Sequence, residues 1–185
     1  MTGFVPLESS RVRLRPFAET DLPEFARYRA LPGVARFQSW SSYSLADAEK
    51  LFAGMQRTPF GKPGSWHQIA IADKDTDTLL GDCALHFLED EHQAEIGFTL
   101  APEHQGRGLA SAAVGLLLDY LFGSWHMHRV IAVTDAENLP AQALLTRLGF
   151  RQEAHFVQNI FFKGRWGDEC LFACLASEWR TPAAR

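Results

Sequence analysis

The residues with the clearest chemical potential are two glycines, Gly106 and Gly108, which enclose Arg107 in a polar turn. A strand-like run, residues 96–100, precedes the turn, and a helical pattern of apolar residues follows it over residues 109–120. Glycines let backbone N–H groups approach an anion, and a helix N-terminus adds partial positive charge. The spacing therefore predicts a phosphate cradle, to which Arg107 adds a full charge. The residues predicted to form it are Gln105, Gly106, Arg107, Gly108, Leu109 and Ala110.

A dinucleotide-binding loop is the alternative for the same glycines. Such a loop needs Gly-x-Gly-x-x-Gly, and Ser111 stands where the third glycine belongs. An acidic residue, Asp135, does follow the next predicted strand, as that fold requires. The glycine loop of a dinucleotide fold normally lies near the start of its domain, whereas this turn comes after residue 104. These departures favour a phosphate site of another kind.

The elements that must position this turn follow from hydrophobic periodicity and turn signals. The predicted order is β–α–α–β–β–β–α–β–α–β–β, an α/β layout with a mixed sheet. Residues 129–134 are almost continuously apolar, which is typical of a strand buried on both faces and parallel to its predecessor. Residues after Ser177 are expected to fray. The predicted strands are residues 11–17, 66–72, 79–87, 96–100, 129–134, 151–162 and 168–175.

Capping signals mark where three of the helices begin. Asp21 and Ser44 each start a capping-box pattern, with an acidic residue three positions later. Asn138 can cap the helix that ends before Gly149. Between the first two helices lies a loop, up to residue 44, that is rich in aromatic residues and serines.

Two sequence blocks together resemble a known family. Gln105-Gly106-Arg107-Gly108-Leu109-Ala110 resembles the Gln/Arg-x-x-Gly-x-Gly/Ala signature of the GCN5-related N-acetyltransferases (GNAT), which bind the pyrophosphate of acetyl-CoA. Residues 138–150 are similar to the family's second block, which begins with Asn and ends in Leu-Gly-Phe. With residues 14–16 and 164–169, the chain resembles the RimJ/RimL-type branch.

The resemblance covers residues 11–175 and implies one N-acetyltransferase domain over residues 1–185. It implies an α/β fold with a mixed, mostly antiparallel sheet, a central pair of splayed parallel strands and about four helices. Acetyl-CoA would be the co-substrate, with its pantetheine between residues 98–100 and the end of residues 129–134. Gly97 could form a β-bulge that frees backbone groups for this ligand, or could merely relieve packing. The resemblance adds Phe98, Thr99, Leu100 and Asn138 to the predicted cofactor-binding residues.

Acetyl transfer to an amine needs a neutral amine, a donor for the oxyanion and a proton for the thiolate. The resemblance implies Glu95 as the catalytic base, acting directly or through water; a solvated strand-end carboxylate is the alternative. His86 is the second candidate because its intrinsic pKa suits a base near neutrality, although a lone histidine near apolar neighbours is more often structural. His67 and Asp168 are weaker candidates, and Asp168 could instead shape the substrate pocket.

Two residues depart from the family pattern. Ala141 stands where the second block often has Ser, and Leu145 stands where many relatives have a tyrosine that protonates the thiolate. We therefore expect water or a backbone group to supply that proton. An α-amine has a pKa of about 8 and a lysine about 10.4, so an enzyme without an obvious acid–base pair suits the α-amine better.

The expected function is thus transfer of an acetyl group from acetyl-CoA to a primary amine, with a protein N-terminal α-amine as the first choice. The aromatic loop at residues 37–43 and the hairpin near Trp166 are expected to wall the acceptor site. A small polyamine, aminoglycoside or amino-acid-like acceptor is the alternative. A non-catalytic CoA-binding sensor is the other alternative, because it would keep the cradle without needing acid–base groups.

Composition bounds the remaining possibilities. The 185 residues are 46% hydrophobic and 22% charged, as in an ordinary globular protein. A net charge of −4 argues against a nucleic-acid partner, and no run is apolar enough for a membrane span. Cys83, Cys170 and Cys174 have no metal-ligand spacing, so they are interpreted as buried thiols with no metal site. We expect a cytoplasmic protein and leave a homodimer open.

Overall fold

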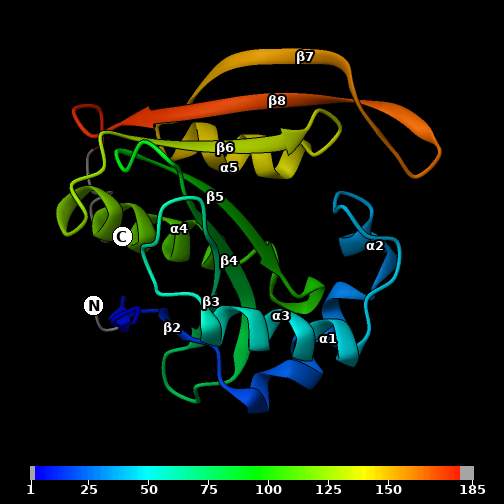
Figure 1. Cartoon of the computed structure of the whole chain (residues 1–185), viewed down its shortest axis with the longest axis vertical. Coiled ribbons are helices and arrows are strands. Elements are labelled where there is room, and N and C mark those ends of the chain that lie inside the picture. The colour runs from blue at the N-terminus through cyan, green and yellow to red at the C-terminus, as the bar shows by residue number, and fades with distance from the viewer. Residues whose placement is uncertain (1–2, 180–185) are drawn as a thin grey trace.

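The computed structural model describes residues 3–179, and they form one eight-stranded sheet with helices on both of its faces (Figure 1). The strand order is β1-β2-β3-β4-β5-β6-β8-β7. Only β5 and β6 pair in parallel, and every other neighbouring pair is antiparallel, which confirms the predicted mixed sheet. The strands are β1 Leu7–Glu8, β2 Val12–Pro16, β3 Trp66–Asp73, β4 Leu79–Phe87, β5 Gln93–Leu100, β6 Arg129–Asp135, β7 Arg151–Phe162 and β8 Arg165–Leu175.

Five α-helices accompany the sheet in the described part of the chain, one more than expected. The additional helix, α2, is a single turn between the first predicted helix and the predicted aromatic loop at residues 37–43. It escaped prediction because it begins with Pro32 and Gly33, which carry no helical periodicity. The helices are α1 Leu22–Arg29, α2 Pro32–Ala35, α3 Leu45–Arg57, α4 Leu109–Gly123 and α5 Leu139–Arg147, with 3₁₀ turns at Glu19–Asp21 and Pro102–His104.

One of the two predicted capping boxes is present and the other is not. At the start of α3, Ser44 Oγ accepts from the Asp47 N–H at 3.2 Å, and the Asp47 carboxylate accepts from the Ser44 N–H at 2.8 Å. Asp21 makes no side-chain cap for α1. Its carboxylate instead accepts from the Ala18 N–H at 2.8 Å and pairs with Arg15 at 2.7 Å. Asp21 therefore ties β2 to the turn that precedes α1.

The core is divided by the sheet into two clusters. Ile69 and Ile71 face the larger cluster, in which α4 and α5 pack, whereas Ala70 faces the smaller cluster under α1 and α3. This alternation is what a strand with two covered faces requires. The sheet therefore holds α4 and α5 on one side and α1 and α3 on the other.

Two sequence expectations fail in this part of the structure. β6 is not buried on both faces, because Val130 and Ala132 are buried while Val133 is 37% exposed. The exposed side of β6 lines a cleft, as described below. The chain is also ordered beyond Ser177, since Trp179 Nε1 donates to Asp119 Oδ1 at 2.8 Å. The rest of the predicted frayed tail, residues 180–185, lies outside the described residues. No helix among the described residues is long and apolar enough to cross a membrane.

Candidate active site

The site forms where the two parallel strands separate. β5 and β6 pair only at Gln93↔Arg129, Ala94↔Val130 and Glu95↔Ile131. Beyond Glu95 the strands diverge (Figure 1), while β5 continues to pair with β4 up to Leu100. The edge of residues 96–100 that faces β6 therefore has no further strand partner among the described residues. Apart from the Leu100 carbonyl, which accepts from Gln105 Nε2, backbone groups on that edge are available to a ligand.

Gly97 lies on this edge but does not form the bulge considered above. It pairs with Ala84 in a β4–β5 register that runs without a shift. A Cβ added at this position would lie 3.5 Å from the Ala84 Cβ, which is an ordinary contact. The divergence of β6, and not a bulge in β5, is what frees the backbone here.

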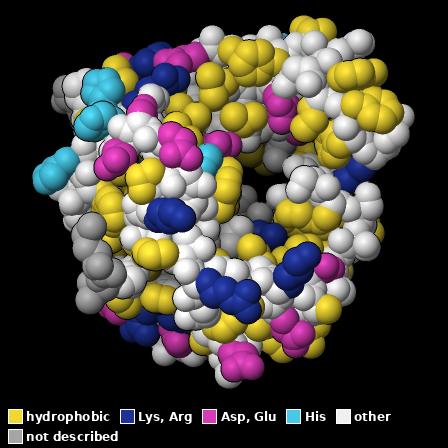
Figure 2. All heavy atoms as spheres, viewed as in Figure 1, with side chains coloured by type: hydrophobic (Ala, Val, Ile, Leu, Met, Phe, Trp, Pro, Cys, Tyr) yellow, Lys and Arg dark blue, Asp and Glu magenta, His cyan; other side chains and the backbone are white. Residues whose placement is uncertain are grey.

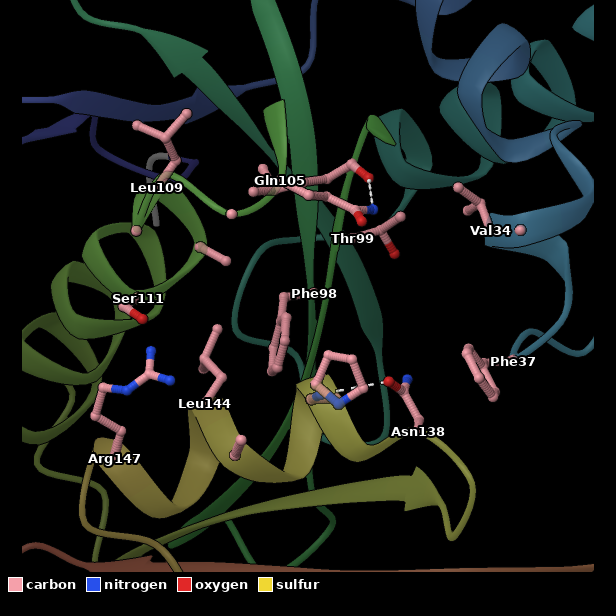
Figure 3. A pocket seen from close by; sticks show the side chains of 18 of the residues that line it. Val34, Phe37, Phe98, Thr99, Gln105, Leu109, Ser111, Asn138, Leu144 and Arg147 are labelled. Atoms are coloured by element: carbon pink, nitrogen blue, oxygen red, sulfur yellow. Dashed lines mark hydrogen bonds between the residues drawn. The ribbon is translucent and has the colours of Figure 1, made fainter. Parts of the chain in front are cut away.

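A cavity of about 440 Å³, which we name the donor cavity after the predicted role of its lining residues, opens between α4, α5 and the divergent end of β5 (Figure 3). Nine of the ten predicted cofactor-binding residues line it: Phe98, Thr99, Leu100, Gln105, Gly106, Gly108, Leu109, Ala110 and Asn138. The tenth, Arg107, is exposed and does not line it. The structure thus gathers the predicted residues in one place but directs the turn's arginine elsewhere.

The glycine turn has the geometry of an anion cradle. Gly106 and Gly108 have φ of +72° and +74°, the left-handed region that glycine adopts without strain. No hydrogen bond between described residues uses the amide N–H groups of residues 108–111 at the start of α4. Gln105 Nε2 donates to the Leu100 carbonyl at 3.0 Å, which fixes the turn to the end of β5. Four consecutive free amides at a helix N-terminus make a site for phosphate.

Asn138 has the capping role that the sequence suggested. Its Oδ1 accepts from the Ala141 N–H at 3.3 Å at the start of α5. Asn138 and Ala141 also line both the donor cavity and a second cavity on the other side of the divergence. Leu145 is fully buried in the core and lines neither cavity.

The second cavity, which we name the acceptor cleft, has a volume of about 410 Å³. It meets the donor cavity at Phe37, Gln38, Phe98, Thr99, Asn138 and Ala141. Figure 2 shows this face of the molecule hollowed at its centre, with hydrophobic side chains around the opening. The cleft's lining includes the aromatic side chains Trp40, Trp66 and Phe162 and the carboxylates Asp82, Glu95, Asp135 and Glu169.

Glu95 and His86 lie next to each other on neighbouring strands. The two residues are directly paired across β4 and β5, and His86 Nδ1 lies 3.6 Å from Glu95 Oε2. The His86 ring stacks on Trp66, with centroids 4.5 Å apart and an interplanar angle of 11°. Glu95 lines the acceptor cleft, and the buried His86 Nδ1 has no hydrogen-bond partner within the described residues. The two candidate bases therefore belong to one group of side chains.

The weaker candidates lie away from this group. His67 is buried beside Ser65, whose Oγ lies 2.9 Å from its Nε2, and burial lowers the pKa of His67. Asp168 accepts from the Gln158 N–H at 2.8 Å and lies 3.0 Å from His155 Nε2. These two contacts, the Gln158 amide first, lower the pKa of Asp168. Neither residue lines the donor cavity or the acceptor cleft.

Several residues that the fold brings to the site were not predicted from the sequence to belong to it. Asp82 and Arg29 form a buried ion pair of 2.9 Å in the wall of the acceptor cleft. Asp135 and Glu169 stand directly opposite each other on β6 and β8. Arg147, at the end of α5, lines the donor cavity. Their positions depend on strand register and helix orientation, which only long-range pairing determines. Among the described residues there is no cluster of His, Cys, Asp or Glu that could hold a metal ion.

The chain is similar to a known family of enzymes with this fold. The family model of the acetyltransferase (GNAT) domain matches residues 11–151, so the chain belongs to the GNAT acetyltransferases and is an N-acetyltransferase. It is 28% identical over 173 residues to the uncharacterized N-acetyltransferase YnaD of Bacillus subtilis, covering 94% of this chain and 98% of that protein.

Two further similarities concern proteins with named acceptors. The [ribosomal protein uS5]-alanine N-acetyltransferase of Escherichia coli is 27% identical over 122 residues, covering 65% of this chain and 63% of that protein. The crystal structure of spermidine N-acetyltransferase from Vibrio cholerae in complex with CoA and spermine matches with a TM-score of 0.79 and 25% identity. That match covers 92% of this chain and 98% of the other.

Proposed function

We propose that this protein transfers the acetyl group of acetyl-CoA to a primary amine that carries at least one further positive charge. The observation that carries the proposal is the divergence of β5 and β6 after Glu95, because it joins a donor cavity to a separate acceptor cleft. The left-handed glycine turn and the free amides of residues 108–111 fit the phosphates of CoA. When bound, acetyl-CoA supplies an activated thioester.

Glu95 is proposed to take the proton that the acceptor's ammonium must lose, directly or through water. Its side chain lines the acceptor cleft at the last β5 residue that pairs with β6, and it retains 26% exposure. His86 lies against it at 3.6 Å and is held by stacking on Trp66. We assign His86 as a positioning residue, because it does not line the acceptor cleft.

The remaining requirements fall to the backbone and to solvent. The edge of residues 96–100 that faces away from β4 offers N–H groups to an oxyanion, and such donors stabilise the tetrahedral state. The described side chains lining the donor cavity include no Tyr, Cys, His, Lys or carboxylate. A thiol with a pKa of about 8.5 is a tolerable leaving group without a side-chain acid.

The charge of the acceptor cleft supports a cationic acceptor. Glu95, Asp135 and Glu169 all line the cleft, and Asp135 and Glu169 are direct cross-strand neighbours. Like charges directly opposite each other destabilise a sheet, so a bound cation would relieve this repulsion. Neither carboxylate has an ion pair within the described residues. The charge of Asp135 helps to raise the pKa of Arg165, but the ion pair of Arg165 is with Glu137. A polyamine-like acceptor would place its second ammonium beside this pair.

A protein N-terminal α-amine is the second candidate. The β7–β8 hairpin carries Phe161 and Trp166, which are directly paired and 60% and 58% exposed. They adjoin Ile160 and Phe162, which line the acceptor cleft. A peptide that leaves the cleft could lie on these aromatic side chains, and its α-amine needs less help from a base.

The discriminating experiment is a thiol-release assay with acetyl-CoA, offering spermidine, spermine and peptides with uncharged side chains. The proposal expects turnover with the polyamines, and the double substitution Asp135→Asn with Glu169→Gln should raise the polyamine KM about tenfold without changing the KM of a neutral peptide. If only the peptides are acetylated, and the double substitution does not change their KM, the acceptor is a protein N-terminal α-amine and not a polyamine. Release no faster than the uncatalysed rate with every amine would favour the sensor.

The role of Glu95 is tested by Glu95→Gln, with Glu91→Gln in the exposed turn before β5 as the matched control. Loss of a positioned base should lower kcat by about 10²-fold, while acetyl-CoA affinity stays unchanged. The control variant should retain full turnover. A loss of less than threefold in Glu95→Gln between pH 6 and 9 would make Glu95 a bystander.

A further inference from the structure

The arginines of this protein differ in whether they are neutralised. Eight of the twelve arginines that the structure describes form ion pairs with carboxylates. The four without an ion pair among the described residues are Arg11, Arg57, Arg107 and Arg147. Arg57 ends α3, on the opposite side of the sheet from α4. The other three are associated with the glycine turn or the donor cavity, as the following observations show.

Arg11 lies against the glycine turn although Gly108 is 97 positions further along the sequence. Arg11 immediately precedes β2, and the first residue of that strand, Val12, is fully buried in the core cluster under α4. A Cβ built on Gly108 would lie only 3.0 Å from Arg11 Nη1. The φ of +74° is the reason that this position is glycine, and the Cβ distance places the Arg11 guanidinium beside it. The next arginine on the strand, Arg13, instead pairs with Glu8 at 2.8 Å and Asp77 at 3.3 Å.

Arg147 approaches the same region from α5. It lines the donor cavity together with Leu144 and Ser111. In Figure 3 its guanidinium extends from α5 toward Ser111, which lies in the first turn of α4. The amide of Ser111 is one of the four free amides of the cradle. Arg107, which is part of the signature sequence, is exposed and absent from the cavity lining, as Arg11 is. The Arg11 guanidinium nevertheless lies against the turn at the Cβ position of Gly108, whereas no hydrogen bond, ion pair or ring contact between described residues holds the Arg107 side chain.

We propose that Arg11 and Arg147, and not Arg107, supply the positive charge that holds the phosphates of the acetyl donor. The inference rests on the proposed use of acetyl-CoA and names the residues that bind it. A chain with a net charge of −4 must attract a polyanionic donor through local cations. Guanidinium groups suit this role because their planar array of N–H donors matches phosphate oxygens. The backbone amides then fix the position of the phosphate, and the two arginines provide most of the attraction.

The test is calorimetric titration of CoA into the parent protein and four variants, Arg11→Gln, Arg147→Gln, Arg107→Gln and Arg13→Gln. The first two should each raise the Kd for CoA about tenfold or more, as loss of a hydrogen bond between charged groups does. Arg107→Gln should change the Kd less than threefold. Arg13→Gln is the matched control, on β2 and two residues after Arg11, and should also change the Kd less than threefold. Thermal unfolding of each variant checks that the fold is retained.

The outcomes separate this inference from the function on which it rests. A parent protein that binds no CoA would overturn the proposed function and this inference with it. CoA binding that is lost in Arg107→Gln and retained in Arg11→Gln and Arg147→Gln would overturn the inference alone. Equal weakening in all four variants, including Arg13→Gln, would also overturn it, because it would show a general effect of net charge.

Discussion

Replacement of Asp82 by Asn tests the buried ion pair that walls the acceptor cleft. Asp82 is 1% exposed, and its carboxylate accepts from the Tyr28 hydroxyl at 2.6 Å and from Arg29 Nη2 at 2.9 Å. With its amide turned to donate, Gln68 Nε2 lies 3.0 Å from the same carboxylate. Arg29 in turn is 5% exposed and stacks over the ring of Phe25 at 4.2 Å. Removing the carboxylate would leave a guanidinium buried without its counter-ion.

The protonation states at this site follow from the same contacts. Burial raises the pKa of Tyr28 well above its ordinary value, and the charge of Asp82 adds to the effect, so the hydroxyl stays protonated and donates. Burial, the largest single influence, works to lower the pKa of Arg29, but the attraction of Asp82 and smaller contributions from Tyr28 and Tyr43 together outweigh it, so the pKa is raised. Arg29 therefore remains charged, and in Asp82→Asn that charge has no partner.

The expected cost is large because only one partner is removed. Breaking a buried pair in this way costs about 3–5 kcal/mol. For a protein of this size each kcal/mol lowers Tm by roughly 2–4 °C, so Tm should fall by roughly 6–20 °C. The double variant Arg29→Met with Asp82→Asn removes both charges and should be more stable than Asp82→Asn alone.

The assay is urea unfolding of the parent, both single variants and the double variant, arranged as a double-mutant cycle. We expect a strong coupling between Arg29 and Asp82. The expectation fails if Asp82→Asn loses less than about 1 kcal/mol, which is the range of an exposed pair. It fails equally if the cost of the double variant equals the sum of the two single costs.

Three further outcomes follow from single positions. Gly108→Val forces a branched side chain into a φ of +74° and toward Arg11 Nη1, so it should weaken CoA binding at least tenfold while far-ultraviolet circular dichroism stays unchanged; unaltered affinity in calorimetry would contradict the cradle. His86→Phe keeps a ring to stack on Trp66 but removes Nδ1 beside Glu95, so kcat should fall about threefold or more with unchanged CoA affinity; an unchanged kcat would leave His86 a packing residue. Burial lowers the pKa of His67 below its ordinary value of 6.5, so protonation favours the unfolded state and stability should fall as the pH drops below about 6.5. His67→Gln should reduce that loss between pH 7 and 5 in urea unfolding, and an unreduced loss would assign the pH dependence to other groups.

The sequence predicted best what depends on neighbours along the chain. The strand, the glycine turn and α4 are contiguous, so the cradle could be read locally, and five of its six predicted residues line the donor cavity. The Ser44 cap of α3 is equally local. The parallel pairing of β5 and β6 followed from composition, because a nearly continuous apolar strand is typical of a parallel sheet. The Asp21 prediction shows the limit of such signals, since Arg15 on β2 competes for the carboxylate.

What the sequence could not provide is register. His86 and Glu95 were alternative bases until the pairing of β4 with β5 placed them side by side. Arg107 was expected in the cradle because of its position between two glycines, and the orientation of a side chain in a turn cannot be read from that spacing. The repulsive pair of Asp135 and Glu169 exists only because β6 and β8 align at those residues. In two of these cases the deciding contact joins segments that are distant in the sequence, and in the case of Arg107 the geometry of the turn decides where the side chain points.

A final prediction follows from the distribution of charge between the two cavities. The donor cavity is lined by Arg147, which has no ion pair within residues 3–179, and Arg11 lies beside the glycine turn; the acceptor cleft is lined by Glu95, Asp135 and Glu169. The net charge of −4 does not reveal that the two cavities have opposite charge, because it is the sum over all charged residues, including those in ion pairs on the surface. A polyanionic donor and a cationic acceptor are then attracted to separate sites on either side of the diverging strands.

Since salt screens exposed charges, raising the ionic strength from about 0.05 to 0.5 M should raise the KM of both substrates. The combined substitution of Arg11 and Arg147 by Gln should remove most of the salt dependence for acetyl-CoA and leave that of the amine unchanged. Steady-state kinetics at both ionic strengths measures this, and a salt dependence of the amine KM that disappears together with that of the donor would refute the separation of the two charged sites.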